Sequence, residues 1–244
     1  IQQDLADTLQ LLADEGRDGF YTGAMAESLV AGVRDVGGIW SMQDLASYQV
    51  VVREPVQIAY RDLHITSAAL PSSGGLVLAE TLNILEHYDM NELGEPDFMH
   101  ITVEAMRRSY RDRAQYMGDS DFVDVPVEML SSKQYASGLN QSIRMDHASN
   151  SLHLAPTSGD KPEGEDTTHF SIIDKDGNRV SATLSINYPF GSGVVPPGTG
   201  VLLNDEMDDF SSKPGLPNAY GLVGAEANAI APGKRMLSSM SPTF

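Results

Sequence analysis

The first 118 residues alternate between two hydrophobic periods. Apolar residues three or four positions apart share one face of a helix, whereas apolar residues two positions apart share one face of a strand. The helical period predicts a helix that ends at Gly16, a second that ends at Gly37, and a short helix opened by a capping box at Ser41. The period of two predicts a β-hairpin that begins near residue 56. The apolar positions are Leu5, Leu12, Met25, Leu29 and Val33 in the helices, and Val56, Ile58, Tyr60, Leu63 and Ile65 in the hairpin.

Two more helices are predicted before residue 118. Residues 71–75, Pro-Ser-Ser-Gly-Gly, break the chain and lead into an apolar helix that carries Leu78, Leu82 and Leu85. A long helix over about 98–117 follows and has a basic face. Arginines at helical spacing usually form a solvated face held by salt bridges, and this is the expectation here. The face consists of Arg107, Arg108, Arg111 and Arg113.

A second hairpin is predicted further along the chain. Residues 167–174 and 178–187 flank Lys175-Asp176-Gly177, and the second strand alternates apolar and polar positions. A three-residue loop with Gly177 in the left-handed conformation pairs Ile172 with Val180, so that the apolar faces match. A two-residue loop would mix the faces. The preferred register places Thr167 opposite Ser185, with Asn187 on the same polar face.

Thr167 follows a segment that cannot form a core. Residues 155–166 hold no large apolar side chain, which predicts a solvated linker in which the backbone is easily cut. A threonine hydroxyl needs a base to act as a nucleophile, and one solution is the threonine's own α-amine, freed by cleavage of the preceding bond. The alternative is a half-buried hairpin with a polar solvent face and no chemistry.

Composition narrows the class of protein. The 244 residues carry 34 acidic and 16 basic side chains, a formal charge of −18. Such a charge argues against nucleic-acid partners and anionic membrane surfaces. The chain has no cysteine, which excludes disulfides and thiolate chemistry. No apolar stretch is long enough for a membrane span.

Other polar groups are ambiguous on sequence alone. Asp205, Glu206, Asp208 and Asp209 form an acidic group that could be a solvated loop or a weak Ca²⁺ site. Ser238 and Ser239 could be a simple polar turn. The six histidines show no metal-ligand spacing. His169 lies on the polar face of the second hairpin, and we do not expect it to act as the base.

Several long motifs in order resemble the γ-glutamyltransferases (γ-glutamyl transpeptidases), members of the N-terminal-nucleophile hydrolases. The resemblance covers essentially the whole chain. It rests on residues 166–171 (Asp-Thr-Thr-His-Phe-Ser), 190–193 (Phe-Gly-Ser-Gly), 200–210 (Gly-Val-Leu-Leu-Asn-Asp-Glu-Met-Asp-Asp-Phe), 213–222 and 234–242, and upstream on 71–75 and 83–86.

The resemblance implies a fold and a processing event. The fold would be α+β, a four-layer αββα sandwich. A precursor would cleave itself at the Asp166–Thr167 bond. Residues 1–166 would then be the C-terminal part of a large subunit, ending in the linker 155–166. Residues 167–244 would be the N-terminal part of a small subunit, and the two would pair in one domain.

The resemblance also implies a reaction. Thr167 would attack the γ-carbonyl of glutathione or another γ-glutamyl compound. The resulting ester would pass the γ-glutamyl group to water or to an amino acid or peptide amine. Ser185, usually threonine in relatives, would hydrogen-bond Thr167 and assist processing. We expect no cofactor and no metal.

Matching positions imply a substrate site. Glu206 and Asp209, with Asn187 beside them, would bind the substrate α-ammonium group. Ser238 and Ser239 would bind the α-carboxylate. Tyr220, in a lid loop over 213–225, would close the pocket, although it could equally be a core aromatic residue.

The resemblance leaves alternatives and gaps. A sister acylase (cephalosporin acylase or poly-γ-glutamate depolymerase) or an inert unprocessed segment would fit parts of the pattern. The family's oxyanion-hole glycine pair and its carboxylate-binding arginine lie outside the chain, so we expect this segment alone to be incomplete. The family suggests a periplasmic or extracellular location.

Overall fold

The computed structural model describes residues 1–151, 154, 167–218, 221 and 223–244. The chain packs as two compact units. The first unit consists of Ile1–Val52 and Ser185–Asp205, and the second of Arg53–Leu184 and Glu206–Phe244. The expected division at residue 167 concerns cleavage rather than packing and stays a prediction.

The first unit is helical and confirms the predicted helix ends. It contains α1 (Gln3–Glu15), α2 (Arg17–Tyr21), α3 (Gly23–Asp35) and α4 (Met42–Ser47). Gly16 adopts φ +62 between α1 and α2, a conformation that favours glycine. The Ser41 hydroxyl accepts from the Asp44 backbone N–H, and the Asp44 carboxylate accepts from the Ser41 N–H, which confirms the capping box. Helices α3 and α4 bury Ala26, Leu29, Val30 and Leu45 against Val201 and Leu203.

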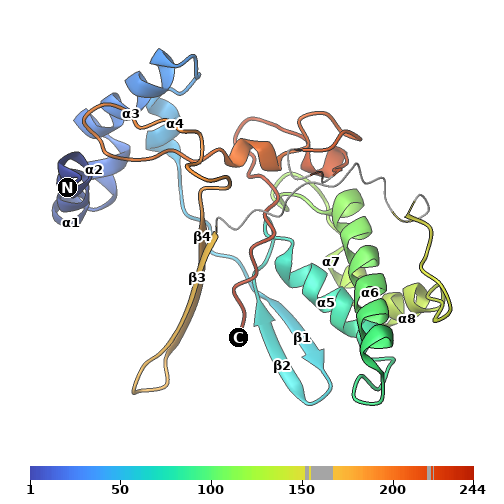
Figure 1. Cartoon of the computed structure of the whole chain (residues 1–244). Helices are drawn as coiled ribbons and strands as arrows, with labels where there is room; N and C mark the ends of the chain where they lie inside the picture. Colours follow the sequence, from blue (N-terminus) through green and yellow to red (C-terminus); the bar gives the residue numbers. More distant parts are fainter. Residues whose placement is uncertain (152–153, 155–166, 219–220, 222) are drawn as a thin grey trace. The chain divides into compact units, whose positions relative to one another are not determined.

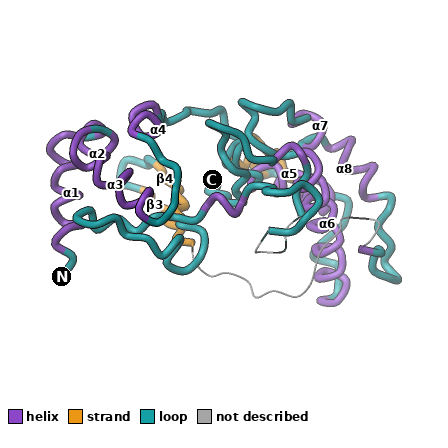
Figure 2. The backbone as a smooth tube through the Cα atoms, turned by 90° about the horizontal axis from the view of Figure 1, so that it is seen from above, coloured by secondary structure: helices purple, strands orange, loops and turns teal. Residues whose placement is uncertain are grey.

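The second unit contains the predicted first hairpin and, among its described residues, four α-helices. Strands β1 (Val56–Tyr60) and β2 (Leu63–Ser67) pair antiparallel, with Ile58 opposite Ile65. The helices are α5 (Gly74–Leu85), α6 (Glu95–Tyr116), α7 (Val127–Leu130) and α8 (Lys133–Asn140). Helix α5 packs against α6 and α8, and Figure 2 shows α5 and α6 side by side.

The second hairpin lies in the second unit up to Leu184. It consists of β3 (Thr167–Ile173) and β4 (Arg179–Ser185). In the alternative reading without chemistry the hairpin is half-buried, and the side chains of Phe170 and Ile172 on its apolar face are 42% and 53% exposed. The apolar face is therefore only partly covered, because a matched apolar face is buried only where another segment packs on it.

The last residues of the chain lie beside both hairpins. Phe244 exchanges backbone hydrogen bonds of 2.8 and 2.9 Å with Thr66 at the edge of β2. The Thr243 N–H donates to the Ser181 hydroxyl of β4 at 3.0 Å. The two hairpins are thus joined through the segment at the C label in Figure 1.

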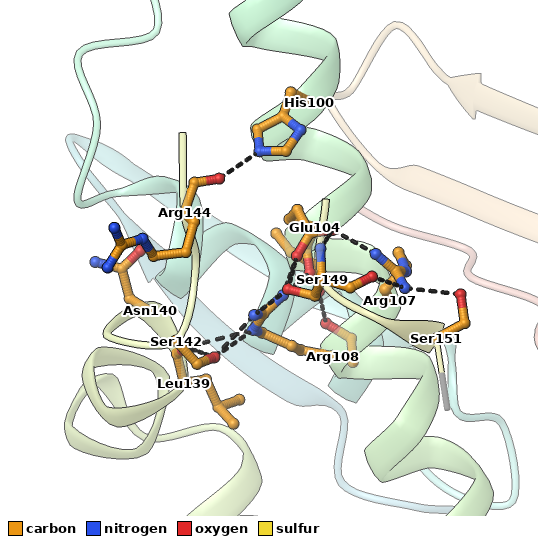
Figure 3. A network of polar contacts seen from close by, with 12 residues as sticks. His100, Glu104, Arg107, Arg108, Leu139, Asn140, Ser142, Arg144, Ser149 and Ser151 are labelled. Carbon is orange, nitrogen blue, oxygen red and sulfur yellow. Dashed lines mark hydrogen bonds and ion pairs between the residues drawn. The ribbon is translucent and has the colours of Figure 1, made fainter. Parts of the chain in front are cut away.

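The basic face of α6 is partly buried, at Arg108 and Arg113, which corrects the sequence-based expectation of a solvated face. Arg108 is 1% exposed, and its guanidinium Nη1 lies 2.7 Å from Glu104 Oε2, which is also buried. Arg107 pairs with the same carboxylate, and the Ser149 N–H donates to it at 3.1 Å (Figure 3). Burial alone would raise the pKa of Glu104, but hydrogen bonds from Ser149 and Arg108 and the Arg107 charge lower it to about 2. The salt bridges were predicted correctly; their burial was not.

Helices and strands occur together, as the predicted α+β class requires. Among the described residues, the strands form two two-stranded sheets. None of the described helices is long and apolar enough to cross a membrane.

Candidate functional site

The second hairpin has the register expected from its apolar pattern. Gly177 adopts φ +85 in the loop. The Asp174 N–H donates to the Asn178 carbonyl at 3.0 Å, and His169 Nδ1 lies 2.8 Å from the Thr183 hydroxyl further along the strands. Both pairs fit the three-residue loop. Continued to the ends of the strands, this register makes Thr167 the counterpart of Ser185.

Thr167 is the first residue of β3 and is exposed. Its position at the start of a strand fixes the backbone that carries its hydroxyl. His169 lies two residues inside the strand, and both ring nitrogens are within hydrogen-bond distance of hydroxyls, Thr183 at 2.8 Å and Ser171 at 3.2 Å. Those contacts place His169 in the polar face of the hairpin, and the expectation that it is not the base stays a prediction.

Ser185 and Asn187 shape the turn that follows β4. The Asn187 N–H donates to the Ser185 hydroxyl at 2.9 Å. Asn187 is 6% exposed and adopts φ +71, and its side-chain amide donates to the Asp205 carbonyl at 3.3 Å. The Asp205 carboxylate accepts from the Tyr188 N–H at 3.0 Å. Asp205 therefore holds this turn, which distinguishes it from the three acidic residues that follow.

Residues Glu206–Asp209, three of which are acidic, form a short 3₁₀ turn, η2. This segment is called the acidic turn. Burial raises the pKa of Asp209 to about 7, together with the charge of Glu206 and a hydrogen bond to it, while Arg113 acts in the opposite direction. Two carboxyl groups this close resist ionising together. An additional cation would relieve that repulsion, so the turn is suited to bind an ammonium group.

The acidic turn is anchored by its neighbours. The Asn228 side-chain amide donates to the Asp209 carbonyl at 2.7 Å, and Phe210 is 3% exposed. Asn228 belongs to the second 3₁₀ turn, η3 (Glu226–Asn228). The described residues contain no group of three histidine, aspartate or glutamate side chains arranged to hold a metal ion.

The serine turn, defined as residues 237–239, lies against the start of α5. The Ser73 N–H and hydroxyl both donate to the Ser238 carbonyl at 2.8 Å, and the Ser238 N–H donates to the Pro71 carbonyl at 2.9 Å. A Cβ atom on Gly74 would lie 2.6 Å from the Met240 carbonyl. The Pro-Ser-Ser-Gly-Gly motif thus holds the serine turn by hydrogen bonds, and Gly74 leaves room for the Met240 carbonyl that follows the turn.

Sequence reasoning missed Arg113, whose side chain contacts the serine turn. Its guanidinium Nε donates to the Ser73 hydroxyl at 2.9 Å, and Nη2 donates to the Leu237 carbonyl at 3.4 Å. Its charge also interacts with Asp209. The helical spacing of the arginines placed Arg113 on the basic face, and no signal in the sequence separated it from the others.

The structure brings together part of the expected site. Glu206 and Asp209 interact directly, and Arg113 links Asp209 to the serine turn of Ser238 and Ser239. These residues and Thr167 belong to the second unit, whereas Ser185 and Asn187 belong to the first. Asp166, Tyr220 and the linker 155–166 lie outside the described residues, so the cleavage-site and lid assignments stay predictions.

Known proteins match the chain over its full length. The family model for gamma-glutamyltranspeptidase matches residues 1–244. A glutathione hydrolase proenzyme from Pseudomonas sp. (strain A14) is 52% identical over the whole chain, which spans 43% of that protein. The chain thus spans less than half the length of this relative.

Superposition on solved structures confirms the expected fold class. A cephalosporin acylase from Bacillus halodurans superposes with a TM-score of 0.80 at 30% identity, over 99% of this chain and 41% of that one. The gamma-glutamyltranspeptidase of Helicobacter pylori superposes with a TM-score of 0.61 at 42% identity, over 67% of this chain and 47% of that one. This chain belongs to the gamma-glutamyltranspeptidase family.

Proposed function

We propose that this chain carries the nucleophile and the substrate head-group site of a self-processing γ-glutamyltransferase and glutathione hydrolase. The observation that carries the proposal is Thr167, exposed as the first residue of β3 in a chain that belongs to this family. Cleavage of the Asp166–Thr167 bond turns the Thr167 amide into a free α-amine. That amine then serves as the base for its own hydroxyl.

The proposed reaction proceeds in two steps. The Thr167 hydroxyl attacks the γ-carbonyl of a γ-glutamyl amide such as glutathione, and the α-amine takes the hydroxyl proton. The amide C–N bond breaks, the proton passes to the leaving amine, and a γ-glutamyl ester remains on Thr167. Water or the amine of an amino acid or peptide then attacks the ester, and the Thr167 hydroxyl is restored.

The proposed head-group site recognises a zwitterion. Glu206 and Asp209 bind the α-ammonium group, which is supported by the mutual repulsion of their carboxyl groups. The resemblance assigns Asn187 to the same group. Ser238 and Ser239 bind the α-carboxylate, which is supported by the way the start of α5 holds their turn. A site built to pair these charges discriminates strongly against analogues that lack them.

The remaining assignments rest on family membership. Ser185 assists processing by bonding to Thr167, Tyr220 closes the lid, and the large and small subunits stay paired after cleavage. No cofactor takes part in the proposed reaction. A periplasmic or extracellular location is proposed on the same ground.

Two variants of the intact protein test the proposed function. The wild type is expected to split into two chains, the smaller beginning at Thr167, and to hydrolyse a γ-glutamyl anilide. Thr167→Ala is expected to remain a single chain without activity, while Thr167→Ser keeps a hydroxyl and retains measurable processing. Full γ-glutamyl hydrolysis by an unsplit Thr167→Ala protein would refute the proposal.

The superposition on a cephalosporin acylase favours a second candidate, an acylase of the same fold. The two activities differ in the head group, because a glutaryl amide keeps the terminal carboxylate but lacks the α-ammonium group. Comparing γ-glutamyl and glutaryl anilides at equal concentration separates them. We expect clear preference for the γ-glutamyl substrate, while preference for the glutaryl substrate would establish the acylase.

A further inference from the structure

Arg113 has an unusual environment for a cation. It lies in the last turn of α6 and is 8% exposed. Within the described residues its guanidinium forms no ion pair at contact distance, and its two hydrogen bonds go to the Ser73 hydroxyl and the Leu237 carbonyl. Burial lowers the pKa of Arg113, while Tyr110 and Asp209 oppose that effect. A buried cation without a contacting carboxylate is costly, and such a cost calls for a compensating role.

The hydrogen bonds of Arg113 converge on the serine turn. Nη2 reaches the Leu237 carbonyl directly at 3.4 Å. Nε holds the Ser73 hydroxyl at 2.9 Å, and that hydroxyl donates to the Ser238 carbonyl at 2.8 Å. The guanidinium therefore fixes two successive carbonyls of the turn through one rigid planar group. A lysine has one ammonium group and could not replace both donors in this geometry.

The charge of Arg113 acts on the other half of the head-group site. Asp209 interacts with Arg113 through space, and Arg113 lowers the Asp209 pKa against the combined effect of burial and Glu206. Removing the arginine charge would leave that carboxyl group with a higher pKa. Fewer Asp209 side chains would then be ionised at neutral pH to hold a substrate ammonium group.

We propose that Arg113 is a positioning residue of the substrate head-group site, which holds the serine turn through its hydrogen bonds to the Ser73 hydroxyl and the Leu237 carbonyl. The inference rests on the proposed function. Arg113 touches neither the substrate nor the reacting atoms in this account, and acts only through Ser73, the serine turn and Asp209.

Three variants of the full-length protein, each measured after self-cleavage, test this role. Arg113→Met removes both the charge and the donors, Arg113→Lys keeps the charge, and Arg107→Met on the same helix is the matched control. KM and kcat for a γ-glutamyl anilide are measured between pH 6 and 8. Loss of a hydrogen bond from a charged group usually costs about 10- to 100-fold in affinity.

Arg113→Met is expected to raise KM about 10- to 100-fold with a smaller change in kcat. The midpoint of its KM–pH profile should move to higher pH, which loss of packing alone would not cause. Arg113→Lys should have the wild-type midpoint and a KM between those of wild type and Arg113→Met. Arg107→Met should leave both the midpoint and KM near wild type. An Arg113→Met protein that self-cleaves with unchanged KM and midpoint would overturn the inference, as would an equal shift in Arg107→Met.

The proposed function has its own separate outcome. If Thr167→Ala is inactive and uncleaved while Arg113→Met behaves as wild type, only the Arg113 inference fails. If Thr167→Ala remains active, the proposed function fails, and the Arg113 inference fails with it. If Arg113→Met does not fold, Arg113→Lys carries the test through KM alone, and an unchanged KM in that variant overturns the positioning role.

Discussion

Glu80 is expected to make the protein less stable as pH rises. It lies on α5 and is 0% exposed, with the Asp112 carboxylate as its neighbour. Burial raises its pKa from 4.5 to about 8, the neighbouring Asp112 charge adds to that effect, and Arg111 opposes it. Asp112 already accepts from Arg111 Nε and from the Tyr135 hydroxyl, each at 2.7 Å. The structure therefore favours Glu80 in its neutral form.

The size of the effect follows from proton linkage. A carboxyl group whose pKa is raised on folding binds a proton more tightly in the folded state, so stability falls as pH rises from the unfolded to the folded pKa. That window runs from 4.5 to about 8 for Glu80. One pH unit corresponds to about 1.4 kcal/mol per proton, so the loss between pH 5 and pH 8 is about 3 kcal/mol, to order of magnitude.

Glu80→Gln removes this penalty while keeping the side-chain size. Urea denaturation of the intact protein at pH 5 and pH 8 measures it, and the variant should gain stability over wild type as pH rises. Glu86→Gln is the control on the adjacent turn, because hydrogen bonds from Lys133 and the Arg61 N–H lower the Glu86 pKa. That variant should lose a little stability at higher pH instead. A Glu80→Gln difference that is the same at both pH values would refute the reasoning.

Three further predictions concern single side chains. Because the Asp209 pKa is raised to about 7, KM for a γ-glutamyl anilide should fall up to about tenfold between pH 6 and 8 as the carboxylate ionises, and Asp209→Asn should flatten that profile at a high KM. Ser185→Ala should slow self-cleavage, measured on gels over time, while Ser185→Thr should retain it; equal rates would contradict the role of the hydroxyl. Glu104→Gln should cost about 3 kcal/mol in urea denaturation, because Arg108 would remain buried without its partner charge; a loss no larger than that of an exposed control would contradict the buried pair.

Local patterns predicted much of the backbone. The capping box at Ser41, the helix end at Gly16 and the left-handed Gly177 are set by residues close together in the sequence, so short-range rules suffice. The register of β3 and β4 followed from matching apolar faces and is confirmed by the pairing of Asp174 with Asn178. The family motifs then supplied the candidate site residues.

Burial could not be predicted in the same way. The arginines of α6 have the spacing of a solvated face, but Arg108 is covered by residues 139–149 and Arg113 by the serine turn, both distant in sequence. Glu80 sits in an apolar helix whose pattern does not reveal the carboxylate of Asp112 across from it. The apolar side chains of β3 are more exposed than their alternation suggests. Apolar alternation indicates which residues can be buried, but it does not show which segment covers them.

The central claim is that Thr167 is the nucleophile. Mass spectrometry of the self-cleaved protein, quenched in acid during turnover of a γ-glutamyl anilide, tests it most directly. We predict the mass of one added γ-glutamyl group on the peptide that begins at Thr167, and none on the digestion peptide that contains residue 167 in the uncleaved Thr167→Ala protein. A γ-glutamyl group found on any other residue, or turnover by Thr167→Ala, would contradict the account.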